Sequence, residues 1–195
     1  WVSFPDFVAV TGAKPVIVPT IPEKQYEPDF SFLEKAINSN TKGIIINSPS
    51  NPTGGVWGDE AIKKTLNIAK KNNLWVFSDE CYEQLTYDTK FKSIQEYDLS
   101  NDRILTFQSC SKTYSMTGWR IGYTAGHPEI IKAMSKIQSQ STSCPNSIAQ
   151  YAAVEALSGN QDEVFKMKAV FQKRRDFIVA ELNQIEGVSC ETPGG

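Results

Sequence analysis

The sequence predicts an α/β protein with a mostly parallel central sheet and helices on both faces of that sheet. Apolar runs without polar alternation recur along the chain, which is typical of strands covered on both faces. Segments with apolar residues at helical spacing separate these runs, and strands joined by such helices favour parallel pairing. The clearest runs are Lys42–Asn47, Leu74–Phe77 and Ile104–Phe107.

The amino-terminal part of the chain predicts short elements. Ser3 is placed to cap a helix that runs to Gly12. The segment Lys14–Pro19 is expected to form a short strand. A capping box over Ser31–Glu34 predicts the start of another helix, in which apolar residues at helical spacing form one face.

The later part of the chain is dominated by predicted helices. Asp59–Lys71 is expected to be helical and amphipathic, because its acids come first and its lysines last, in keeping with the helix dipole. Arg120–Gly126 is predicted to be a strand, reached by a connection too short for a parallel crossover from a neighbouring strand. Further helices are predicted over Pro128–Ser139, Ser147–Ser158 and Asp162–Glu186.

The composition is that of a soluble globular protein. The 195 residues are 40% hydrophobic and 22% charged, which is ample for one buried core. A net charge of −2 provides no basic field for nucleic acid and no polybasic patch for a membrane, so neither is an expected partner. The four cysteines lack metal-ligand spacing, so we expect reduced thiols in a cytoplasmic protein and no metal site.

One polar stretch, Ser109–Tyr123, follows the last of the apolar runs. Within it Lys112 lies just past the carboxyl end of a predicted strand, where open α/β sheets bind ligands. Arg120 could hold a phosphate together with Ser109 and Ser111, because its guanidinium fork and their hydroxyls are donors. A lysine nucleophile beside a phosphate site suggests pyridoxal phosphate. The alternative is a surface lysine in a serine-rich loop.

A set of segments in a fixed order carries a more specific pattern than any of them alone. They are Asn47–Gly54, Ser78–Glu83, Ser109–Tyr123 and Ser139–Gln150. In this order they resemble the aspartate aminotransferase family of fold-type I pyridoxal phosphate enzymes, in particular its bacterial-type branch. The resemblance runs from Trp1 to Gly195 and implies pyridoxal 5′-phosphate as cofactor.

By this resemblance Lys112 holds the cofactor's aldehyde as a Schiff base and carries a proton during the reaction. Asp79 keeps the cofactor's pyridine nitrogen protonated, with Glu80 as the alternative carboxylate. Tyr82 and Asn51 hydrogen-bond the cofactor's phenolic oxygen, although each residue taken alone is more often structural. The resemblance therefore assigns catalysis to Lys112, Asp79 and Tyr82.

The resemblance also assigns residues that bind the cofactor at its two ends. Arg120, Ser109 and Ser111 bind the phosphate, and the arginine is the strongest member because its fork matches a phosphate dianion. Turn formation is the competing role for both serines. Trp1 aligns with the aromatic residue that stacks on the pyridine ring.

The implied reaction moves an amino group between an amino acid, by resemblance aspartate, and a 2-keto acid, by resemblance 2-oxoglutarate. Ser139 stands where other branches have an arginine for the substrate's side-chain carboxylate, so these residues do not predict a dicarboxylate preference. The family implies a homodimer with shared active sites. The alternatives are an aromatic aminotransferase, a carbon–sulfur lyase, a transcription regulator that senses pyridoxal phosphate, or a non-catalytic remnant of the fold.

The chain resembles the middle of a longer protein. Residues 1–187 correspond to the pyridoxal phosphate-binding large domain without its amino-terminal portion. Residues 188–195 correspond to the start of a carboxyl-terminal small domain, and Val188–Cys190 is expected to begin a strand there. We expect this piece alone to be inactive, because the remaining portions would supply further phosphate donors and the arginine for the substrate's α-carboxylate.

Overall fold

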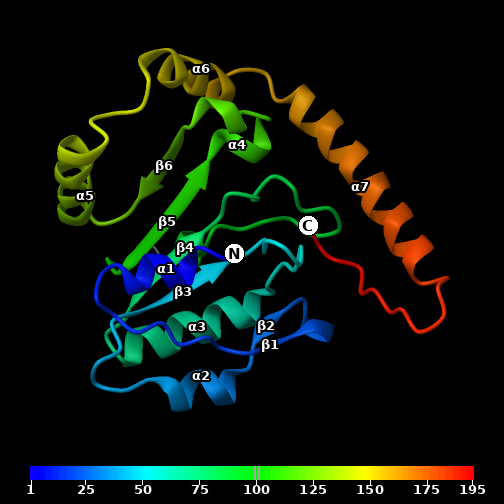
Figure 1. Cartoon of the computed structure of the whole chain (residues 1–195), viewed down its shortest axis with the longest axis horizontal. Helices are drawn as coiled ribbons and strands as arrows, with labels where there is room; N and C mark the ends of the chain where they lie inside the picture. Colours follow the sequence, from blue (N-terminus) through cyan, green and yellow to red (C-terminus); the bar gives the residue numbers. More distant parts are fainter. Residues whose placement is uncertain (99, 101) are drawn as a thin grey trace.

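The computed structural model describes residues 1–98, 100 and 102–195, and at its centre lies a four-stranded sheet (Figure 1). The strands lie in the order β3 (Gly43–Asn47), β4 (Trp75–Asp79), β5 (Ile104–Ser109) and β6 (Gly122–Ala125). β3, β4 and β5 pair in parallel, and β6 pairs antiparallel with β5. The predicted α/β class is therefore confirmed, including its mostly parallel sheet and the antiparallel last strand.

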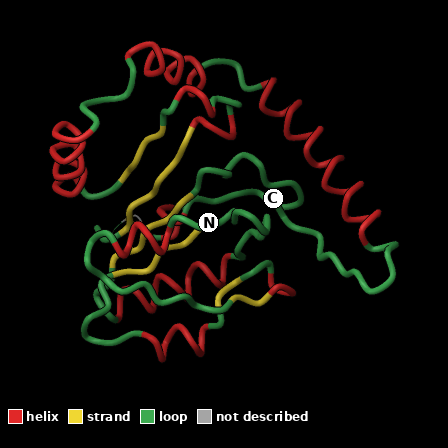
Figure 2. The backbone as a smooth tube through the Cα atoms, viewed as in Figure 1, coloured by secondary structure: helices red, strands yellow, loops and turns green. Residues whose placement is uncertain are grey.

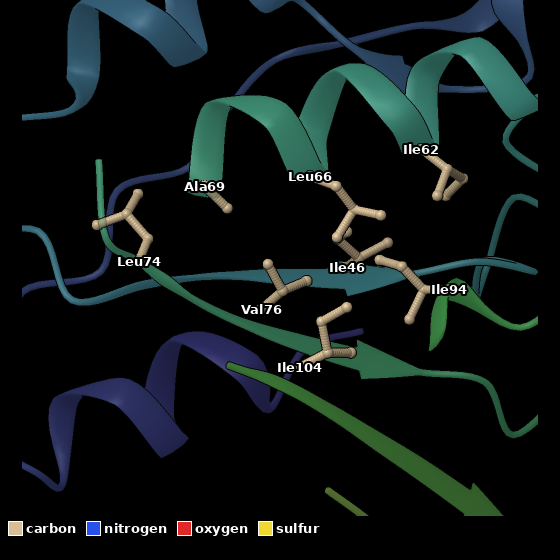
Figure 3. Close-up of a cluster of buried hydrophobic side chains, with 8 residues drawn as sticks. All are labelled: Ile46, Ile62, Leu66, Ala69, Leu74, Val76, Ile94 and Ile104. Atoms are coloured by element: carbon tan, nitrogen blue, oxygen red, sulfur yellow. The ribbon is translucent and has the colours of Figure 1, made fainter. Parts of the chain in front are cut away.

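Helix α3 (Asp59–Lys71) covers one face of the sheet, and the hydrophobic core lies between the two (Figure 3). The helix has the predicted bounds, with its buried side chains at helical spacing. In the same view α1 (Phe4–Ala9) lies on the other face of the sheet. The core cluster comprises Ile46, Ile62, Leu66, Ala69, Leu74, Val76, Ile94 and Ile104.

The strand register brings the carboxyl ends of β3, β4 and β5 to one edge of the sheet. Asn47 pairs with Asp79, and Asp79 pairs with Phe107. Ser109, at the end of β5, pairs with Gly122 at the start of β6. Because side chains alternate between faces along a strand, Asn47 and Asp79 both lie on the face opposite to α3.

The remaining elements surround this centre (Figure 2). None of the described helices is long and apolar enough to cross a membrane. A separate two-stranded antiparallel sheet lies beside α2 in the amino-terminal part. The elements are β1 (Thr20–Ile21), η1 (Pro22–Lys24), β2 (Glu27–Pro28), α2 (Phe30–Ala36), η2 (Ile94–Tyr97), α4 (Cys110–Thr113), η3 (Thr117–Trp119), α5 (Pro128–Ser141), α6 (Ser147–Ser158) and α7 (Asp162–Leu182).

Several predictions for the amino-terminal part are wrong in detail. Lys14–Pro19 is not a strand, because prolines at its second and last positions cannot donate to a strand ladder. The helix expected near residue 31 exists, but the Asp29 carboxylate caps it by accepting from the N–H groups of Ser31 and Phe32. Ser3 provides no side-chain cap to α1, which ends before Gly12.

Other predicted boundaries shift by a few residues. β4 and β5 extend beyond the apolar runs, so that Asp79 and Ser109 are the last residues of their strands. α7 ends at Leu182, short of the predicted end, and Val188–Cys190 forms no strand within this chain. A strand needs a partner along its edge, and this segment pairs with no other strand that the structure describes.

The chain after α7 returns toward the loops at the end of the sheet (Figure 1). Arg175 of α7, only 9% exposed, anchors this return. Its guanidinium forms an ion pair with Asp88, donates hydrogen bonds of 2.9 and 2.6 Å to Asp176, and donates one of 2.9 Å to the carbonyl of Pro193. The guanidinium also lies 4.8 Å from the centre of the Tyr87 ring. The sequence did not predict this anchor.

Candidate active site

The loops that leave β3, β4 and β5 carry most of the predicted site residues. Asn51 lies in the turn after β3, Tyr82 follows β4, and Lys112 lies on α4 directly after β5. Asp79 is the last residue of β4 itself. Because the carboxyl ends of parallel strands share one edge of the sheet, residues far apart in sequence meet there.

Asn51, Tyr82, Lys112 and Trp1 form one continuous set of neighbours. Nδ2 of Asn51 donates a 2.8 Å hydrogen bond to the hydroxyl of Tyr82. Nζ of Lys112 lies 5.8 Å from the centre of the Tyr82 ring. The amino group of Trp1 donates a 3.1 Å hydrogen bond to the carbonyl of Asn51, and the Trp1 residue is 56% exposed. The residues expected around the cofactor ring thus lie together.

Asp79 and Lys112 both act on the thiol of Cys81. The Asp79 carboxylate accepts a 3.1 Å hydrogen bond from the backbone N–H of Cys81. Burial and the Asp79 carboxylate raise the pKa of the Cys81 thiol to about 12, and the Lys112 ammonium opposes this shift. A carboxylate and an ammonium that both perturb one side chain lie close to it. Asp79 ends β4 and Lys112 lies on α4 directly after β5, so the strand register brings both to the same edge of the sheet.

Glu80, the alternative carboxylate, is buried and accepts hydrogen bonds from groups within the protein. It is 1% exposed, and its Oε1 accepts hydrogen bonds from the Ser78 hydroxyl at 3.1 Å and the Ile94 backbone N–H at 3.0 Å. Nε2 of Gln108 donates to its other oxygen at 3.4 Å. A buried carboxylate whose oxygens are satisfied by protein donors has a structural role. Asp79 is the carboxylate that remains for a ligand.

Arg120 lies at the same edge, just before β6. Its backbone is left-handed, with φ of 52°, which is uncommon for a residue with a side chain. Nη1 donates a 2.8 Å hydrogen bond to the carbonyl of Thr117. Its other guanidinium nitrogens form no hydrogen bond or ion pair with any residue that the structure describes. A pocket of about 790 Å³ opens beside Arg120, lined also by Trp119 and Asn146.

The two serines lie where β5 passes into α4. The Ser109 hydroxyl accepts a 3.0 Å hydrogen bond from the N–H of Ser111 and donates one of 3.4 Å to the carbonyl of Ile121. Ser109 is thus the cap of α4, which is the turn-forming role that the sequence left open for it. Ser111 is 9% exposed. Phosphate binding by either serine stays a prediction.

The chemistry of these groups fits pyridoxal phosphate. The exposed Lys112 forms no hydrogen bond or ion pair with the described residues, so its amine is available to an aldehyde. Asp79 suits a protonated ring nitrogen, and the unused donors of Arg120 suit a phosphate. The part of the chain that the structure describes holds no cluster of three or more histidine, cysteine or acidic side chains that could bind a metal.

Two neighbours of the site were not among the predicted site residues, namely Asn47 and Cys81. Asn47 hydrogen-bonds both the Asn51 backbone and the Asp79 carbonyl. A polar residue at the end of a buried strand was the signal that could have identified Asn47. Cys81 lies within the segment Ser78–Glu83, between Asp79 and Tyr82, but its proximity to Lys112 depends on strand pairing and could not be read from the sequence.

The chain is similar in sequence to aminotransferases along its whole length. Residues 1–195 match the family described as aminotransferase class I and II. A probable aspartate/prephenate aminotransferase of Rhizobium leguminosarum bv. phaseoli is 46% identical, and the aspartate aminotransferase of Bacillus subtilis (strain 168) is 41% identical. Each match covers 100% of this chain and 50% of the relative.

Solved structures show the same likeness. The aspartate aminotransferase of Rhizobium meliloti superposes with a TM-score of 0.95 at 39% identity, covering 100% of this chain and 50% of that one. The aromatic aminotransferase of Pyrococcus horikoshii OT3 gives a TM-score of 0.95 at 35% identity, covering 100% and 53%. The chain spans about half the length of the relatives it matches. By sequence and by structure, as the resemblance predicted, the chain belongs to the aminotransferase class I and II family.

Proposed function

We propose that the full-length protein is a pyridoxal phosphate-dependent aminotransferase that moves an amino group between aspartate and 2-oxoglutarate. The observation that carries the proposal is the grouping of Lys112, Tyr82 and Asn51 at the sheet edge that also bears Asp79. Membership of the class I and II family supports it. The names of the relatives from Rhizobium leguminosarum and Bacillus subtilis support the choice of aspartate.

When bound, pyridoxal phosphate supplies an aldehyde that can take up an amino group and a ring that can accept electrons. Lys112 would hold the aldehyde through its amine and would move a proton at the substrate's Cα. Asp79 would keep the ring nitrogen protonated, because a carboxylate favours an adjacent cation. Tyr82 and Asn51 donate hydrogen bonds to the phenolic oxygen.

The remaining residues of the proposed site orient the cofactor. Arg120 binds the phosphate with the guanidinium nitrogens that it does not use within the protein, and Ser109 and Ser111 add donors. Trp1 would stack on the ring and restrict its tilt. The main-chain nitrogen of Trp1 bonds the Asn51 carbonyl, so the residue lies beside the turn that carries Asn51.

A second candidate amino acceptor is prephenate. The relative at 46% identity is named a probable aspartate/prephenate aminotransferase, and this name favours prephenate beside 2-oxoglutarate. Both reactions use aspartate as amino donor and the same residues of this chain.

For the full-length protein we propose a cytoplasmic homodimer. The four cysteines are all free, which suits a reducing compartment. We further propose that residues 1–187 belong to the large domain and that residues 188–195 begin the small domain. The end of α7 at Leu182 and the irregular chain after it support a boundary in this region.

The proposal is tested by incubating the full-length protein with pyridoxal phosphate, aspartate and either 2-oxoglutarate or prephenate. We expect oxaloacetate with at least one acceptor, and none from the matched variant Lys112→Arg, which keeps the charge but not the geometry of the amine. Pyruvate and ammonia from cystathionine, without oxaloacetate from aspartate, would favour a carbon–sulfur lyase. Sequence-specific DNA binding without turnover would favour a transcription regulator.

A further inference from the structure

Asn47 occupies the last position of β3 and uses both ends of its amide. Its Oδ1 accepts a 2.9 Å hydrogen bond from the backbone N–H of Asn51. Its Nδ2 donates to the carbonyls of Pro49 and Asp79, each at 3.4 Å. The side chain is partly buried, so these bonds are partly shielded from water. Asn47 therefore ties the turn after β3 to the end of β4.

The two segments that Asn47 joins carry different parts of the proposed site. Asn51 donates to the Tyr82 hydroxyl and is expected at the phenolic side of the ring. Asp79 is expected at the ring nitrogen. Asn47 and Asp79 are paired residues in adjacent parallel strands and share one face of the sheet, so the amide spans directly between them.

The base of the turn depends on this asparagine. Other bonds brace the turn farther along, from the Trp57 N–H to the Ser48 hydroxyl at 2.9 Å and from the Ser50 N–H to the Gly55 carbonyl at 2.9 Å. The N–H of Asn51 has its hydrogen bond with Asn47. Without Asn47 the turn keeps its outer bonds and the bond from Asn51 to Tyr82, but the backbone of Asn51 loses its link to the Asp79 carbonyl.

We propose that Asn47 is a positioning residue, which fixes the distance between Asn51 and Asp79 and so holds the donor to the phenolic oxygen in register with the carboxylate at the ring nitrogen. The inference rests on the proposed function and deepens it. Asn47 has no expected contact with the cofactor itself. Its effect passes through Asn51.

The inference makes a directional prediction for the bound cofactor. A donor to the phenolic oxygen favours the unprotonated form of the bound cofactor. A misplaced Asn51 therefore makes that form less stable relative to the protonated form. The pH midpoint of the visible absorption band should therefore rise. A loss comparable to one hydrogen bond corresponds to a rise of roughly 0.5 to 1 pH unit.

The test is a spectrophotometric pH titration of the full-length protein loaded with pyridoxal phosphate. Asn47→Ala and the milder Asn47→Ser, whose hydroxyl is too short to reach the Asn51 backbone, should both raise the midpoint. The matched control is Asn183→Ala. Asn183 also bonds a backbone N–H and a backbone carbonyl, both of Cys190 at 2.8 and 3.0 Å, at the far end of α7. The pH midpoint of the Asn183→Ala variant should equal that of the wild type.

A double variant separates positioning from general damage. In the Asn51→Ala background, Asn47→Ala should add no further rise of the midpoint, because its effect passes through Asn51. An unchanged midpoint in Asn47→Ala and Asn47→Ser, or a rise that adds fully to that of Asn51→Ala, would overturn this inference alone. A wild-type protein without any visible band would overturn the proposed function and this inference together.

Discussion

The side-chain amide of Asn51 donates a 2.8 Å hydrogen bond to the hydroxyl of Tyr82, and the Tyr82 ring lies 5.8 Å from Nζ of Lys112. This relationship joins the loops after β3, β4 and β5 into one site. Because the two donors are hydrogen-bonded to each other, they should act on a bound ligand as a pair and not independently.

The first prediction concerns this pair. Tyr82→Phe removes the hydroxyl and keeps the ring beside Lys112, so the pH midpoint of the bound cofactor's visible band should rise by about one unit, the scale of one lost hydrogen bond. Asn51→Ala should raise it too. In the double variant the combined rise should be smaller than the sum, measured by spectrophotometric titration. Fully additive shifts would show that the two donors do not cooperate.

A second prediction separates the two neighbouring carboxylates. Asp79→Asn should lower kcat by about 10²- to 10³-fold, because it removes the charge that keeps the ring nitrogen protonated. Stability should change little, because the asparagine oxygen can still accept from the Cys81 N–H. Glu80→Gln should leave kcat within a few-fold but lower the free energy of unfolding by about 1 to 3 kcal/mol, since its amide faces the donors of Ser78 and Ile94. Steady-state kinetics measure kcat, and urea unfolding measures the free energy of unfolding, for each variant. The reverse pattern would transfer the catalytic role to Glu80.

A third prediction concerns the anchor of the chain after α7. Arg175→Met removes the charged bonds to Asp88, Asp176 and the Pro193 carbonyl and should lower the free energy of unfolding by about 1 to 3 kcal/mol. The carboxylates are more than half exposed, so water replaces part of the loss. The control is Arg174→Met, at the exposed neighbouring residue. It should change the free energy of unfolding by less than about 0.5 kcal/mol. Equal losses of unfolding free energy in the two variants would contradict the role of Arg175 as an anchor.

A fourth prediction follows from Glu83. Burial, with a contribution from Glu80, raises the pKa of its carboxyl above the ordinary 4.5. The folded state therefore holds this proton more tightly than the unfolded state, and stability is lost as the pH rises from the ordinary pKa through the folded one.

Glu83→Gln removes this titration while its amide oxygen can still accept from Gln108, which donates to Glu83 at 2.8 Å in the wild type. The variant's stability relative to the wild type should increase as the pH rises above the ordinary pKa, as determined by urea unfolding at several pH values. A relative stability that falls over this range would contradict the raised pKa.

Much of the fold was predictable because local patterns determine it. The apolar run at Lys42–Asn47 specifies a strand, and the charge order of Asp59–Lys71 specifies a helix. The expected cover on both faces of that strand is not met within this chain, because Ile45, on the face opposite to α3, is 39% exposed. Local rules failed where competing groups lay within a few residues. Asp29 displaced the capping box at Ser31, and prolines prevented a strand over Lys14–Pro19.

The site was predictable only in part, for a different reason. Lys112, Asp79, Tyr82 and Asn51 occur in motifs, and a resemblance to a family identified them. The role of Arg175 depends on partners far away in sequence, such as Asp88, 87 positions earlier. Contacts of this kind leave no periodic pattern. Likewise, the sequence carries no local signal that Glu80 is buried and Asp79 is not. The burial of each carboxylate depends on strand pairing and on the cover by η2.

The central claim is that Lys112 holds the cofactor. Its most direct test is borohydride reduction of the full-length protein mixed with pyridoxal phosphate, followed by mass spectrometry of its peptides. We predict a reduced pyridoxyl phosphate label on Lys112 and its loss in Lys112→Arg. A stoichiometric label on another lysine, or one that persists undiminished in the variant, would contradict the account.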